Sequence, residues 1–131
     1  MIGLDTNVLV RYLLQDDPRQ SAQASRLIES LSAEEPGFVP VVVLVELAWV
    51  LGAGYKLSRE QLAAVLETLL RSKELVIDRA DLVMQAAARF SSGGADFADA
   101  LIERMAMAAG CTATMTFDQG AAKAAGMTLV R

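Results

Sequence analysis

The chain has 131 residues, a net charge of −4 and a hydrophobic fraction of 53%. This length fits one hydrophobic core, so we predict a single domain over residues 1–131. The sequence contains no histidine, which excludes histidine-based catalytic triads, His-ligated zinc sites and acid–base catalysis by imidazole. Any catalysis must therefore use carboxylates, lysine, tyrosine, hydroxyl groups or a metal held by oxygen ligands.

The cysteine content and the apolar runs bear on the protein's location. Cys111 is the only cysteine, lies in an apolar stretch and can form no internal disulfide, so we expect it to be a small buried residue. The longest apolar run, residues 39–51, is broken by Pro40 and Glu46 and is shorter than the stretch of about 20 residues that spans a bilayer. The N-terminus resembles no export signal. We therefore expect a cytoplasmic protein with no membrane segment.

The first half of the chain alternates short apolar segments with helical patterns. We predict a strand at residues 2–4, a helix at 8–14 and a second helix at 19–31, which Asp17 and Pro18 open. A short strand at 38–40 leads into a buried helix at 41–51, which Gly52 and Gly54 end. The next helix begins with the capping-box pair Ser58 and Gln61 and runs to about residue 71.

The second half continues the alternation. We predict a strand at residues 75–77, a helix at 81–90, a loop at 92–94 and a long helix at 95–109. A strand at 112–116, a short helix at 118–125 and a last strand at 127–130 complete the chain. Strands that alternate with helices predict an α/β sandwich around a central, mainly parallel sheet.

Four acidic residues stand out against this pattern: Asp5, Glu46, Asp99 and Asp118. Asp5 and Asp118 follow predicted strands, and the carboxyl ends of parallel strands lie at one edge of a sheet. Apolar residues surround Glu46 and Asp99 in their helices, where a charge needs a partner or a metal ion. Hard divalent cations prefer carboxylate oxygens, and two such ions together support phosphodiester hydrolysis. We therefore expect a metal site.

Each of these acidic residues also has a structural interpretation. Asp5 and Asp118 are each at a position where aspartate caps a helix. Asp96, three residues before Asp99 on the same helix face, is either a further ligand or the cap of that helix. Glu46 could instead lie on a solvent-exposed face.

Four short motifs then point to a family. LDTNVLVRYLL (4–14), VELAWVL (45–51), ADFADALI (95–102) and TFD (116–118) occur in order, and together they resemble a PIN domain of the VapC toxin type. The resemblance covers nearly the whole chain. It implies a three-layer α/β/α sandwich with a five-stranded parallel sheet. It also implies a ribonuclease that depends on Mg²⁺ or Mn²⁺, forms a homodimer and is blocked by a cognate antitoxin.

The resemblance also assigns residues. Asp5, Glu46 and Asp99 match the metal-binding carboxylates, and Asp118 matches the fourth acidic position. Asn7 and Thr116 match polar positions that orient the site. Hydrolysis by water activated at the metal would leave a 5′-phosphate and a 3′-hydroxyl.

Two surface features are tied to partners. Arg11 lies one helical turn beyond Asn7 and is a candidate RNA contact, although an ordinary solvated charge is the alternative. The helix at 8–14 is more apolar than one buried face requires, which predicts either a groove for a partner helix or a wide core-facing stripe. Its apolar residues are Val8, Leu9, Tyr12, Leu13 and Leu14.

Two other functions are compatible with parts of the pattern. The first is the same fold with a silent acidic pocket, used as an RNA-binding or scaffold module; the intact set of carboxylates argues against it. The second is a phosphatase of the haloacid dehalogenase kind. Such enzymes need a second aspartate two residues after the first, where this chain has Asn7.

Overall fold

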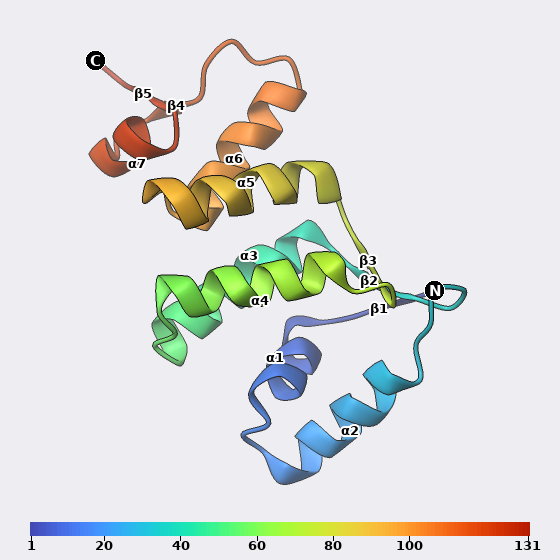
Figure 1. Ribbon diagram of the computed structural model, residues 1–131. Coiled ribbons are helices and arrows are strands. Elements are labelled where there is room, and N and C mark those ends of the chain that lie inside the picture. The colour runs from blue at the N-terminus through green and yellow to red at the C-terminus, as the bar shows by residue number, and fades with distance from the viewer. The chain divides into compact units, whose positions relative to one another are not determined.

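The computed structural model describes residues 1–131, and its helices and strands alternate in the predicted order (Figure 1). The chain divides into two compact units, Met1–Ala80 and Asp81–Arg131. No helix has both the length and the hydrophobicity that crossing a membrane requires.

The first unit is built on a parallel sheet of three short strands. The strands β1 (Ile2–Gly3), β2 (Gly37–Val39) and β3 (Leu75–Ile77) lie in the order β1-β2-β3. Gly37 in the central strand is buried, and a Cβ there would lie 2.7 Å from a side-chain carbon of Leu4 and 2.9 Å from one of Leu31. A larger residue in the centre of the sheet would therefore force the side chains of Leu4 and Leu31 to shift.

Helices follow the strands β1 and β2 in this unit. They are α1 (Thr6–Leu14), α2 (Pro18–Glu29), α3 (Val41–Trp49) and α4 (Arg59–Arg71), with a π-helical turn, η1 (Val50–Gly54), directly after α3. Asp17 caps α2 through the amides of Arg19 and Gln20, and Ser58 forms the predicted capping box with Gln61. The core contains five fully buried side chains: Leu9, Val39, Leu44, Leu47 and Leu51.

The second unit contains three helices and a pair of strands. Helix α5 (Ala80–Gly93) begins at the last residue of the first unit and is followed by α6 (Phe97–Ala108), β4 (Met115–Thr116), α7 (Gln119–Ala124) and β5 (Thr128–Leu129). Strands β4 and β5 are parallel. Val83, Ala86, Ala100 and Leu101 are buried, and the rings of Phe90 and Phe97 meet edge to face with centroids 6.4 Å apart.

A buried carboxylate ties this unit together. Glu103 on α6 is 7% exposed and accepts hydrogen bonds from Arg89 Nη1 on α5 at 3.0 Å and from Arg104 Nε at 2.6 Å. The same Arg89 nitrogen donates to the carbonyl of Ala125, just after α7, at 2.9 Å. One arginine therefore joins α5, α6 and the end of α7.

The structure confirms the α/β class and the parallel strands, and it differs from the sequence-based expectations at the end of α5 and at Cys111. The strands form hydrogen-bonded groups of three and two, so the single five-stranded sheet stays a prediction. Helix α5 continues to Gly93, through the first two residues of the expected loop at 92–94. Cys111 is exposed, so the expectation of a buried thiol is wrong: it lies after the end of α6, and β4 begins only at Met115.

Candidate active site

In the first unit, one threonine connects two of the candidate carboxylates. Asp5 follows β1 and caps α1, where its Oδ1 accepts a hydrogen bond from the backbone amide of Thr6 at 2.9 Å. The Thr6 hydroxyl donates a hydrogen bond to Oε1 of Glu46 on α3. Thr6 itself is 4% exposed. The buried Thr6 therefore links the start of α1 to the Glu46 carboxylate on α3.

Glu46 lies on the exposed side of its helix. The alternative interpretation of an exposed glutamate is therefore correct for its burial, although the side chain is anchored by Thr6. Val42 and Trp49 are exposed on the same helix, at 68% and 71%. Another carboxylate of this unit, Asp78 after β3, accepts a hydrogen bond from the amide of Val41 at 3.1 Å and so caps α3. We assign Asp78 a structural role.

In the second unit, three aspartates lie close enough to influence one another. Asp96 caps α6 by accepting a hydrogen bond from the amide of Asp99 at 3.1 Å, and Asp118 caps α7 through the amide of Ala121 at 3.1 Å. Burial raises the pKa of the Asp99 carboxyl above its ordinary value, and the negative charges of Asp96 and Asp118 raise it further. No hydrogen bond or ion pair compensates the Asp99 carboxylate, which is the electrostatic situation that a cation relieves.

Capping and metal binding are compatible in these residues. Asp5 and Asp118 each use Oδ1 for the cap and Asp96 uses Oδ2, so the second carboxylate oxygen of each side chain can accept another ligand. Neither unit by itself, however, groups three carboxylates around a position for one metal ion. The donors are all oxygens, which suits hard cations such as Mg²⁺ and Mn²⁺ rather than zinc.

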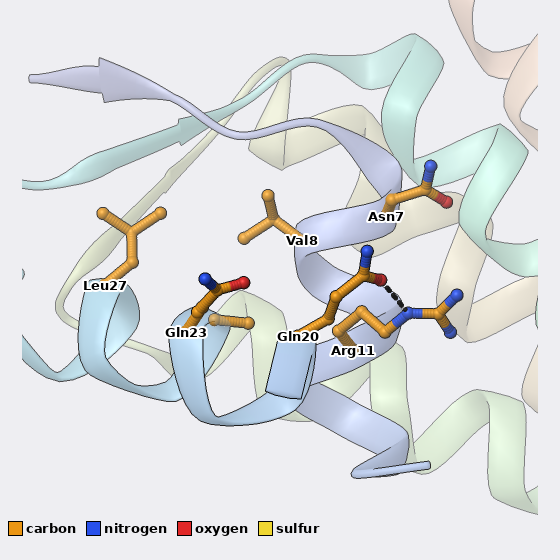
Figure 2. A pocket seen from close by; sticks show the side chains of 7 residues that line it. Asn7, Val8, Arg11, Gln20, Gln23 and Leu27 are labelled. Carbon is orange, nitrogen blue, oxygen red and sulfur yellow. Dashed lines mark hydrogen bonds between the residues drawn. The ribbon is translucent and has the colours of Figure 1, made fainter. Parts of the chain in front are cut away.

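The two polar residues expected to support the site differ in their contacts. Thr116 Oγ1 accepts a hydrogen bond from the amide of Asp118 at 3.0 Å and so shapes the turn that leads into α7. Asn7 is exposed in the first turn of α1 and lines a pocket between α1 and α2 (Figure 2).

Arg11 is held in a polar network. Its Nη1 lies 3.2 Å from Asp16 Oδ2 and 3.2 Å from the Tyr55 hydroxyl, and its Nε donates to Gln20 Oε1 at 2.7 Å. The Tyr55 hydroxyl also donates to Asp16, at 2.9 Å. The charge of Arg11 is therefore largely matched within its own unit.

Comparison with known proteins identifies the family. The family model of the PIN domain matches residues 2–127. The chain belongs to the PIN domain family. One curated relative, the VapC ribonuclease of Aquifex aeolicus (strain VF5), is 31% identical over 99 residues, which cover 75% of this chain and 73% of the relative. The match to the PIN model includes all four predicted carboxylates and spans both units.

One residue of this PIN chain, Thr6, has a role that the sequence patterns do not predict. Thr6 lies between Asp5 and Asn7, and its hydroxyl is the only side-chain group within the first turn of α1 that bonds to Glu46. The available signal was the threonine itself directly after the capping residue, because its hydroxyl can donate one hydrogen bond to a neighbouring segment. Its partner is 40 residues away in the chain, which no local pattern reveals.

Proposed function

We propose that this protein is a divalent-cation-dependent endoribonuclease, the toxin of a VapBC-type toxin–antitoxin pair. The observation that carries the proposal is the uncompensated Asp99 carboxylate, with its pKa raised by burial and by two neighbouring aspartates, in a chain of the PIN family. A carboxyl group whose surroundings destabilise its ionised form is expected at a site where a bound cation compensates the negative charge. The VapC ribonuclease relative supports RNA as the substrate.

The proposed roles follow from the contacts of each carboxylate. Asp5 and Asp99 would hold the principal Mg²⁺ or Mn²⁺, while Glu46 and Asp118 would complete the acidic site and orient the attacking water. Thr6 fixes the Glu46 oxygen that faces it, so that the second oxygen can accept a proton or a water hydrogen. When bound, the cation supplies charge stabilisation for the phosphodiester and lowers the pKa of water. Asp96 acts first as a helix cap, and a ligand role for it is secondary.

The proposal includes one five-stranded sheet in an α/β/α sandwich. A two-stranded parallel sheet is marginal by itself, and β1 has only one hydrogen-bonded neighbour. In one parallel sheet of five strands, the residues that follow the strands, Asp5 and Asp118 among them, would lie at one edge.

The proposed partners are a second copy of the chain and an antitoxin, in the cytoplasm. The exposed Val42 and Trp49 lie seven residues apart on one side of α3, which suits a self-complementary contact. The antitoxin would dock on the apolar helix α1. Leu9, Tyr12 and Leu13 of α1 line a hollow of about 240 Å³ together with residues of α2, α4 and β3, which supports a groove for a partner helix.

Cation binding tests the proposal without any substrate. Binding of Mn²⁺ is measured by electron paramagnetic resonance of the free ion. We expect Mn²⁺ to bind the wild-type protein with at least tenfold higher affinity than it binds the Asp99→Asn variant. Asp81→Asn is the matched control, because Asp81 is acidic and lies in the first turn of α5. Equal Mn²⁺ affinities in all three proteins would contradict the proposal. RNA fragments that end in 2′,3′-cyclic phosphate would contradict hydrolysis by water.

A further inference from the structure

A pocket between α1 and α2 has the lining of a recognition site. It has a volume of about 280 Å³, with an apolar floor of Val8, Ala24 and Leu27. The polar groups are supplied by the remaining lining residues: Asn7, Arg11, Gln20 and Gln23. Figure 2 shows Gln20 and Gln23 on neighbouring turns of α2, facing α1. The pocket is smaller than most sites for whole ligands, so it suits one planar group.

The polar groups of this pocket carry little net charge. Asp16 pairs with Arg11 at 3.2 Å, so the guanidinium offers little net charge to a phosphate. Its Nε instead donates to Gln20 Oε1 at 2.7 Å (Figure 2). This contact orients the Gln20 amide, and its NH₂ group can donate to a ligand. Asn7 and Gln23 each add an amide that can donate and accept.

The pocket also lies near a proposed catalytic residue. Val8 and Asn7 belong to the first turn of α1, which Asp5 caps. One helical turn advances about 5.4 Å along the axis, so the pocket opens close to the start of the helix that carries Asp5. A group bound there would therefore lie near the proposed position of Asp5 in the catalytic site.

We propose that this pocket binds one nucleobase of the RNA strand and sets a base preference beside the scissile phosphodiester, an inference that rests on the proposed ribonuclease function. Bases of single-stranded RNA are recognised by contacts of their flat faces and by hydrogen bonds to their edges. In this proposal the apolar side chains of Val8, Ala24 and Leu27 contact the flat face of the base. The amides of Asn7, Gln20 and Gln23 form hydrogen bonds to its edge. The hollow beside Leu9 and Tyr12 has a mainly apolar lining and fits a protein helix better.

Binding is tested first without cleavage. The ¹⁵N-labelled protein is titrated, in the absence of divalent cations, with the four nucleoside 5′-monophosphates and separately with inorganic phosphate. We expect the side-chain amide signals of Gln20 and Gln23 to shift with at least one nucleotide and not with phosphate. Gln20→Ala should weaken that nucleotide about tenfold, whereas Arg26→Ala, an exposed change on the same helix, should not.

Two results of this titration would overturn the proposed base site. Equal shifts with inorganic phosphate would make the pocket a phosphate site on Arg11. No shift with any nucleotide would exclude a base site and leave the pocket to a protein partner.

The cleavage pattern separates this inference from the proposed function. On a pool of randomised RNA with Mn²⁺, we expect the wild-type protein to prefer certain bases at one position beside the cut. Gln20→Ala and Gln23→Ala should reduce that preference about tenfold, because cleavage beside the preferred base slows, whereas Arg26→Ala should keep both the pattern and the total cleavage of the wild type. Variants that keep the wild-type pattern would refute the pocket alone. A wild-type protein that cleaves no RNA would refute the proposed function, and the nucleotide titration would still decide the pocket.

Discussion

Replacing Glu103 by glutamine tests whether a buried ion cluster holds the second unit together. The carboxylate accepts three hydrogen bonds, from Arg89 Nη1, Arg104 Nε and Arg104 Nη2, at 3.0, 2.6 and 3.0 Å. The amide in Glu103→Gln has nearly the same shape but no charge, and its NH₂ group would face guanidinium donors. Both arginines would lose their shared counter-charge.

The size of the effect follows from burial. Loss of one partner of a fully buried ion pair costs about 3–5 kcal/mol, whereas exposed pairs contribute about 0–1 kcal/mol. The Glu103 side chain is 9% exposed, but Arg89 and Arg104 are 32% and 24% exposed, so water replaces part of the loss. We expect the free energy of unfolding to fall by about 2 kcal/mol at pH 7, which lowers Tm by about 7 °C in a chain of this length.

The effect should depend on pH. The pKa of Glu103 is lowered below its ordinary value despite burial. The hydrogen bond from Arg104 is the largest cause, and the charge of Arg104 and the hydrogen bond and charge of Arg89 add to it. A carboxyl with a lowered folded pKa contributes stability above its unfolded pKa and loses it as the pH falls through the folded value. Urea unfolding at pH 7 and at successively lower pH should therefore show the difference between wild type and Glu103→Gln shrinking in acid.

The control for this experiment is Glu67→Gln. Glu67 pairs with Arg71 at 2.7 Å, but both side chains are well exposed, so the urea midpoint should scarcely move. The reasoning would be refuted by a Glu103→Gln change as small as that of Glu67→Gln at pH 7. It would also be refuted by a difference that stays constant down to the acid limit.

Three further predictions concern single residues. Asp99→Asn should raise the urea midpoint at pH 7 and not in acid, because a raised folded pKa means that ionised Asp99 destabilises the fold as the pH rises; an unchanged midpoint at pH 7 would argue against this. Thr6→Val should lower kcat/KM for RNA about tenfold with an intact circular dichroism spectrum, since the Glu46 contact is lost, and Thr6→Ser should restore it. Cys111 is exposed, so Ellman's reagent should modify it in the folded protein as fast as in urea; slow modification would show that it is covered.

The local signals in the sequence predicted local structure well. Asp17 with Pro18, and Ser58 with Gln61, mark the starts of α2 and α4 where the structure has them, because a cap depends on only a few neighbouring residues. The strand expected at 112–116 is shorter, since β4 pairs only over Met115 and Thr116. Strand ends depend on a partner elsewhere in the chain, and sequence patterns do not specify it.

In the candidate site, too, local features were predictable and contacts between distant residues were not. The positions of Asp5 and Asp118 after strands were predictable from chain order, and so was the capping role of Asp96. The hydrogen bond between Thr6 and Glu46 was not, because it joins residues on different helices. The exposure of Glu46 was also misjudged, since α3 leaves one face of apolar and acidic residues uncovered.

The most direct test of the central claim is RNA cleavage by the purified protein as a function of Mg²⁺ and Mn²⁺. We expect cleavage that rises with either cation, stops with EDTA, leaves 5′-phosphate ends, and falls at least a hundredfold in Asp5→Asn and in Asp99→Asn but not in Asp81→Asn. Cleavage that persists in EDTA, or that survives both substitutions, would contradict a ribonuclease built on these carboxylates.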